Sequence, residues 1–79
     1  MARTARAWRT AVAADGAGFP DLVLAKPGRL LFVELKSENG RLSQEQARWL
    51  AALGLTERAE VKVWRPSDWL GGTIEAVLR

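Results

Sequence analysis

Residues 22–35 read LVLAKPGRLLFVEL, which is two apolar runs separated by a short turn. In the turn, Pro27 presets its own φ and Gly28 accepts a positive φ. Two apolar runs joined in this way predict a β-hairpin. The second run is apolar on both faces of the expected strand, which predicts a central strand covered on both sides.

A helix is expected shortly after the hairpin. Ser43 is a good N-cap residue, and Gln46 stands three positions later, as in a capping box. Gly54 is the candidate residue that ends this helix. The segment between the hairpin and the helix is polar and has the composition of a loop.

Strands and helices are also expected on either side of these elements. Residues 7–12 are a candidate first strand, and residues 60–65 alternate between apolar and polar side chains as a later strand would. Ser67 is a candidate cap for a final helical stretch that resumes over residues 73–78. The expected order is (β)-β-β-α-β-α, an α/β fold with a mixed sheet flanked by helices.

Composition excludes several classes of site. The chain of 79 residues contains no Cys and no His, so zinc sites built on these ligands and Cys- or His-based catalysis are excluded. The remaining chemistry is that of carboxylates, amines and hydroxyls, with or without a hard metal ion. No apolar run approaches the length of a membrane span. Twelve Lys and Arg against nine Asp and Glu give a net charge of +3, which makes a polyanion a plausible partner.

Three charged residues interrupt or border the apolar hairpin: Asp21, Glu34 and Lys36. Glu34 and Lys36 are two positions apart, so their side chains leave the same face of a strand. If Lys26 faces Arg29 across the turn, Asp21 lies directly opposite Glu34 and shares that face. Two carboxylates and an amine are therefore expected to converge on one patch.

Two facing carboxylates repel each other unless a proton or a cation lies between them. Mg²⁺ or Mn²⁺ fits this need, with the main-chain carbonyl of Leu35 as a further candidate ligand. Together with Lys36, such a site suits metal-assisted hydrolysis of phosphodiesters. The alternative is a structural ion-pair cluster in which Asp21 only opens its strand.

A longer pattern adds to this interpretation. The segments GFPDLVL (18–24), LLFVELKSENGRLSQEQARWL (30–50) and VWRPSDW (63–69) together resemble the virus-type replication-repair nuclease (VRR-NUC) domain of the PD-(D/E)XK nuclease superfamily. The resemblance implies a minimal restriction-endonuclease-like core. It also implies a metal-dependent DNA endonuclease, intracellular and cytoplasmic, that acts as a homodimer on branched DNA such as Holliday junctions.

The resemblance also implies roles for individual residues. Asp21 and Glu34 would bind Mg²⁺ or Mn²⁺, and Lys36 would be the catalytic lysine. Gln46 matches a glutamine of the family's site, although a capping role explains it equally well. The candidate contacts to DNA are Ser37, Arg29, Arg41 and Arg48; the alternative for each arginine is a solvated surface position.

One departure from the family concerns the start of the chain. The family has a helix with a glutamate before its first strand, whereas here no glutamate precedes Glu34 and Asp15 is the only earlier acidic residue. Residues 1–17 therefore suggest a basic arm or a first strand of a single domain over residues 1–79. Two alternatives to an active nuclease follow: an inactive nucleic-acid-binding module, or a subunit that depends on a partner.

Overall fold

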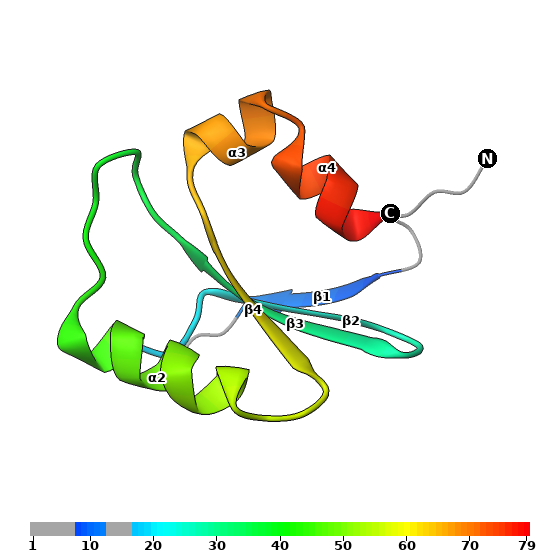
Figure 1. The fold of residues 1–79 in the computed structure, drawn as a ribbon, viewed down its shortest axis with the longest axis horizontal. Coiled ribbons are helices and arrows are strands. Elements are labelled where there is room, and N and C mark those ends of the chain that lie inside the picture. Colours follow the sequence, from blue (N-terminus) through cyan, green and yellow to red (C-terminus); the bar gives the residue numbers. More distant parts are fainter. Residues whose placement is uncertain (1–7, 13–16) are drawn as a thin grey trace.

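The computed structural model describes residues 8–12 and 17–79, which form a four-stranded sheet and three helices (Figure 1). Residues 1–7 and 13–16, which include much of the predicted basic arm and Asp15, lie outside the described residues. The elements follow one another as β-β-β-α-β-α-α, with bounds β1 Arg9–Val12, β2 Leu22–Lys26, β3 Arg29–Leu35, α2 Gln44–Gly54, β4 Ala59–Trp64, α3 Pro66–Leu70 and α4 Thr73–Leu78.

The sheet is mixed, and its strands lie in the order β1-β2-β3-β4. The first three strands are antiparallel, whereas β4 runs parallel to β3 after a crossover through α2. Lys26 pairs with Arg29 across the turn, where Gly28 has a φ of 83°. The hairpin and its predicted register are therefore confirmed.

Helices cover both faces of the sheet, with α2 on one side and α3 and α4 on the other (Figure 1). On the α4 side, Leu31 and Val33 of β3 are completely buried in the main core. The remaining buried members of that core are Trp8, Leu24, Trp64 and Ile74. On the α2 side, the Phe19 ring contacts Phe32 and Trp49 edge-on. The prediction of a central strand covered on both sides is thus confirmed for β3.

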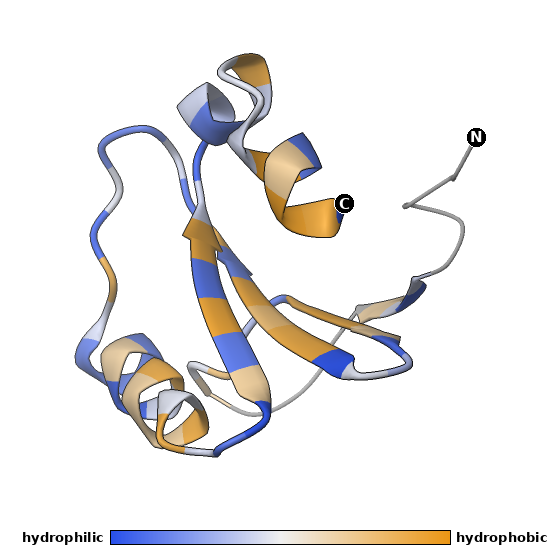
Figure 2. Ribbon diagram, turned by 45° about the vertical axis from the view of Figure 1, so that its right-hand side comes forward, coloured by the Kyte–Doolittle hydropathy of each residue, from blue (hydrophilic) through white to orange (hydrophobic). Residues whose placement is uncertain are grey.

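The last strand shows the alternation expected from its sequence. β4 appears in Figure 2 as bands of hydrophobic and hydrophilic residues, because successive side chains point to opposite faces. Val61 faces α2, where Gly54 approaches it closely: a Cβ added to Gly54 would lie 3.4 Å from Val61 Cγ2. Glu60 and Lys62 face the other side.

Two predicted helix boundaries are wrong. Gly54 is the last residue of α2 rather than the residue that follows it, and Leu55 is the C-cap. Gly54 packs against Val61 of β4 and does not have a positive φ. Arg65 rather than Ser67 is the N-cap of α3, because Pro66 takes the first helical position, which suits its fixed φ.

None of the helices formed by the described residues has both the length and the apolar character that a membrane crossing requires.

Candidate active site

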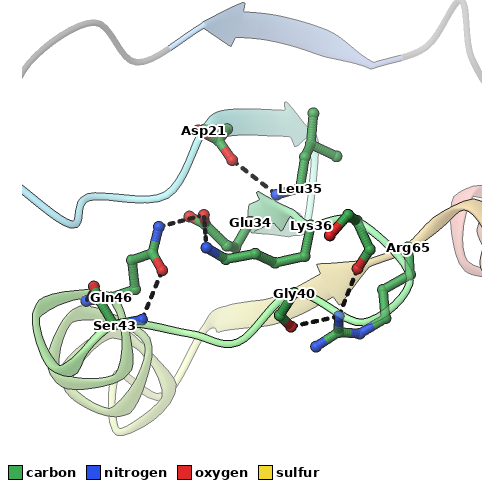
Figure 3. Close-up of polar contacts among 9 residues, drawn as sticks. Asp21, Glu34, Leu35, Lys36, Gly40, Ser43, Gln46 and Arg65 are labelled. Carbon is green, nitrogen blue, oxygen red and sulfur yellow. Dashed lines mark hydrogen bonds and ion pairs between the residues drawn. The ribbon is translucent and has the colours of Figure 1, made fainter.

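The hairpin register brings the two predicted carboxylates together. Leu22 pairs with Val33, and the next position outward sets Asp21 opposite Glu34. Asp21 lies just before β2, and its carboxylate accepts a hydrogen bond of 2.8 Å from the Leu35 N–H (Figure 3). The local turn chemistry of Pro27 and Gly28 therefore fixes a contact between residues fourteen positions apart.

Glu34 is the buried centre of the site, with an exposed fraction of 2%. Its Oε2 accepts a hydrogen bond of 2.8 Å from Gln46 Nε2. The same oxygen lies 3.9 Å from Lys36 Nζ, an ion pair at the far limit of contact. The other oxygen, Oε1, is buried and has no hydrogen-bond partner among the described residues. One half of this carboxylate is therefore satisfied and the other is not.

Burial and charge both act on Glu34. Loss of hydration raises the pKa of Glu34 above its ordinary value, and the negative charge of Asp21 raises it further. The ammonium of Lys36 acts in the opposite direction but does not cancel these effects. Burial and the charge of Asp21 thus both destabilise the ionised form of Glu34, and a cation bound beside it would stabilise that form.

Gln46 links the site to the start of α2 (Figure 3). Its side-chain Oε1 accepts a hydrogen bond of 2.9 Å from the Ser43 N–H, while the Ser43 hydroxyl accepts one of 3.1 Å from the Gln46 N–H. Because the capping box uses the amide oxygen, the amide nitrogen is left to face Glu34. Gln46 therefore caps α2 and contacts Glu34 at the same time.

Close packing at Gly18 brings α2 against the segment that leads to Asp21. Gly18 has a φ of 78°, and a Cβ added there would lie 2.6 Å from the main-chain carbon of Glu45 and 2.8 Å from the Gln46 nitrogen. A side chain at this position would push the start of α2 outward. The glycine in Gly18-Phe19-Pro20-Asp21 thus helps to hold Gln46 within reach of Glu34.

The chemistry of these donors fits a hard divalent ion. Asp21 and Glu34 offer carboxylate oxygens, and the unpartnered Oε1 of Glu34 is a buried acceptor that lacks only a positive partner. Within residues 8–12 and 17–79, no group of three or more His, Cys, Asp or Glu side chains is placed to hold a metal. An ion would therefore need main-chain carbonyls, water or substrate oxygens to complete its ligands, as Mg²⁺ commonly does.

Three of the four predicted DNA contacts lie on or near the loop between β3 and α2. Ser37 and Arg41 are exposed on the loop that follows Lys36. Arg48 is exposed on α2 and forms a surface ion pair of 3.3 Å with Glu45. Arg48 is two positions from Gln46 on α2, so its side chain leaves a different face of the helix from the one that meets Glu34.

Arg29 is not brought to the site. It lies at the opposite end of β3 from Glu34, five residues or about 17 Å along the strand. Its guanidinium makes hydrogen bonds of 2.9 and 2.7 Å to the Glu60 carboxylate and one of 2.7 Å to the Val77 carbonyl. The hydrogen-bonding capacity of this arginine is used within the fold.

Two residues beside the site carried no signal in the sequence. Arg65 and Glu38 tie the loop after Lys36 to the start of α3 through contacts that span 25 to 29 positions. Hydrophobic periodicity does not predict such contacts, because they depend on how β4 and α3 are placed beside β3.

Comparison with known proteins gives a family but no individual relative. The family model described as VRR-NUC domain matches residues 2–65, which is most of the chain and includes Asp21, Glu34, Lys36 and Gln46. No curated protein and no solved structure matches. The mixed sheet, the paired carboxylates and the family match agree with one another, and the chain belongs to the VRR-NUC domain family of nucleases.

Proposed function

We propose that this chain is a DNA endonuclease dependent on Mg²⁺ or Mn²⁺, which hydrolyses phosphodiester bonds in branched DNA such as Holliday junctions. The observation that carries the proposal is the buried Glu34 carboxylate, which faces Asp21 and Lys36 and keeps one oxygen without a partner. Membership of a nuclease family supports the same reaction class.

Each residue has a proposed role. Asp21 and Glu34 hold the divalent ion, with the Leu35 carbonyl as a third protein ligand, and Gln46 orients the Glu34 carboxylate. When bound, the ion supplies charge stabilisation at the phosphoryl group and lowers the pKa of a bound water. Lys36 donates a hydrogen bond to a non-bridging phosphoryl oxygen or to the attacking water. The water oxygen forms the new P–O bond while the P–O bond to the leaving oxygen breaks; the proton of the attacking water passes to solvent, and the leaving oxygen takes up a proton from solvent water.

Contacts to the DNA backbone are proposed for Ser37, Arg41 and Arg48, which are exposed; Ser37 and Arg41 lie on the loop that follows Lys36. Arg29 is left out because Glu60 and Val77 occupy its guanidinium. We further propose that residues 1–79 act as one domain and that two copies form a homodimer. The exposure of Trp69 (70%) and Leu70 (83%) supports a partner that covers apolar surface.

The test is cleavage of a labelled four-way junction and of linear duplex with Mg²⁺, with Mn²⁺ or with EDTA. We expect cutting that requires the ion, prefers the junction and falls about 10²–10³-fold in Lys36→Ala. Asp21→Asn should lose cutting through weaker metal binding. The matched controls are Lys62→Ala, on the opposite face of the sheet, and Glu75→Gln, on the exposed side of α4. Undiminished cutting by the Lys36 and Asp21 variants would contradict the proposal.

A second candidate is a nucleic-acid-binding module without turnover. It is favoured by one observation: only two acidic side chains meet in the described site. In that case binding needs no divalent ion, weakens steeply as salt is raised, and yields no product. A subunit that folds only with a partner is separated from both candidates by the absence of a cooperative unfolding transition in the isolated chain.

A further inference from the structure

The loop that follows the catalytic strand is held by two charged side chains that point in opposite directions. From the start of α3, Arg65 Nη1 donates hydrogen bonds to the carbonyl oxygens of Ser37 and Gly40, both at 2.7 Å (Figure 3). A longer contact of 3.3 Å reaches the carbonyl of Glu38. From the loop, the Glu38 carboxylate accepts hydrogen bonds from the N–H and the hydroxyl of Ser67, at 2.9 and 2.7 Å. We name residues 37–40 the latched turn.

The latched turn begins where the Lys36 main chain is itself fixed to β4. The Lys36 N–H donates a hydrogen bond of 3.0 Å to the carbonyl of Trp64, the residue directly before Arg65. The Gly40 N–H donates one of 3.1 Å to the Ser37 carbonyl, which closes the turn on itself. The guanidinium therefore donates hydrogen bonds to main-chain carbonyls that directly follow the proposed catalytic lysine.

The same turn lies near the side chain of Lys36. A Cβ added to Gly40 would be in van der Waals contact with Lys36 Cδ, at 3.6 Å, and 2.7 Å from the Ser37 hydroxyl oxygen, so the lysine stem passes about one methyl group away from Gly40. Ion pairing alone is a weak restraint on the ammonium, because Nζ lies 3.9 Å from Glu34 Oε2. The latched turn, which directly follows the fixed main chain of Lys36 and borders the path of its stem, is the second restraint on where the ammonium sits.

We propose that Arg65 is a positioning residue for Lys36: its guanidinium holds the latched turn, and the turn holds the lysine stem so that the ammonium faces Glu34. This inference rests on the proposed function of Lys36. It assigns Arg65 no contact with DNA, because Nη1 is used on main-chain carbonyls within the fold.

Kinetics of Arg65 variants test the proposal. In Arg65→Ala, we expect kcat on the four-way junction to fall about 10- to 100-fold with little change in KM, since a displaced catalytic group costs turnover rather than binding. Arg65→Lys should restore kcat at most in part: one guanidinium nitrogen holds both carbonyls, and the shorter lysine side chain does not carry its ammonium as far toward them. Free guanidinium ion at low concentration should partly restore Arg65→Ala, whereas NaCl of equal ionic strength should not. Arg58→Ala, an exposed arginine beyond α2, is the matched control with unchanged kcat.

A double-mutant cycle with Lys36→Ala separates action through the lysine from other roles. If Arg65 acts through Lys36, then Arg65→Ala causes little further loss once Lys36 is alanine. An equal loss in both backgrounds would overturn the proposal. So would a raised KM with unchanged kcat, which is the signature of a direct contact to the DNA backbone.

An assay that needs no cleavage keeps this inference separate from the nuclease activity. Competitive acetylation by acetic anhydride, read by mass spectrometry, compares Lys36 with Lys62 in the same molecule. Arg65→Ala should raise the Lys36 to Lys62 labelling ratio and speed amide hydrogen exchange at Gly40, while Arg58→Ala changes neither. If the Lys36 to Lys62 labelling ratio is unchanged in Arg65→Ala, the positioning role of Arg65 is overturned even where the protein cleaves DNA. If the ratio rises but the wild-type protein does not cleave DNA, only the proposed function is overturned.

Discussion

At the scale of single residues, the main feature is a glutamate buried where its charge is opposed. Glu34 is surrounded by the sheet and α2, faces Asp21, and has one oxygen without a partner. A buried acceptor that lacks a partner costs free energy of about 1–3 kcal/mol or more. A site that binds a cation gives a functional reason for this cost, because the ion supplies the missing positive charge.

This arrangement predicts that Glu34→Gln stabilises the metal-free protein at neutral pH. Because the pKa of Glu34 is raised in the folded state, the protonated side chain favours folding. Its contribution to the free energy of unfolding is fully present below the ordinary pKa of 4.5 and is lost as pH rises through the raised value. The glutamine keeps the shape, can still accept from Gln46, and has no charge to bury. Denaturant unfolding in EDTA should give a larger free energy of unfolding for the variant at pH 7.

The difference between the two proteins should shrink as pH is lowered toward the ordinary pKa of glutamate. Glu75→Gln, an exposed carboxyl on α4, is the control and should show no such trend. A variant less stable than the wild type at pH 7, or a difference that does not vary with pH, would contradict the electrostatic account of Glu34.

At the scale of elements, one arginine joins the hairpin to both β4 and α4. Arg29 donates two hydrogen bonds to the Glu60 carboxylate, and its Nη1 donates a third to the Val77 carbonyl near the end of α4. Its Cζ also lies 5.1 Å from the centre of the Trp8 ring. The hydrogen bond from Arg29 lowers the pKa of Glu60. The C-terminal helix is thus attached to the sheet by charge as well as by apolar packing.

We expect Arg29→Ala to lower the free energy of unfolding by about 1–2 kcal/mol, in the lower part of the range for hydrogen bonds to charged groups because both partners are partly exposed. The contribution of Glu60 is present above its ordinary pKa of 4.5 and is lost as pH falls through the lowered value. Unfolding of the variant and the wild type should therefore differ most at neutral pH. Arg48→Ala, which breaks only a surface pair, should cost less than about 1 kcal/mol; an equal cost would argue against the proposed attachment.

The elements show what the sequence could and could not predict. A two-residue turn fixes hairpin register locally, so the facing positions of Asp21 and Glu34 followed from Pro27 and Gly28 alone. The capping box of Ser43 and Gln46 was likewise local and is confirmed. Whether these residues act in catalysis stays a prediction.

Contacts between distant elements could not be read in the same way. The partner of Arg29 lies 31 positions away, and Arg65 reaches a loop 25 to 28 positions earlier. Such contacts depend on the crossover from β3 to β4 and on the path of the chain after Trp64. The mistaken cap at Ser67 has the same origin, because Pro66 at the first helical position moves the start of α3 to follow Arg65.

At the scale of the whole molecule, a small domain leaves apolar surface uncovered. Trp69 and Leu70 on α3 are exposed by 70% and 83%, and Leu55 after α2 by 88%. Domains of this size bury only about 60% of the surface of the unfolded chain, so a second copy would add stability that the single chain lacks.

The proposed homodimer predicts a concentration-dependent melting temperature. Because association stabilises the folded state by mass action, Tm should rise steadily as the protein concentration is raised about 100-fold. Differential scanning calorimetry with sedimentation at the same concentrations measures both quantities. A constant Tm with a monomer mass throughout would contradict the dimer while leaving the site untouched.

The proposed metal-dependent reaction requires Asp21 and Glu34 to share one cation. Anomalous scattering from crystals soaked in Mn²⁺ measures this directly. We predict a manganese peak between the two carboxylates, within bonding distance of Glu34 Oε1, that disappears in Asp21→Asn crystals soaked in the same way. A fully soaked wild-type crystal with no peak there, or with manganese bound only elsewhere, would contradict it.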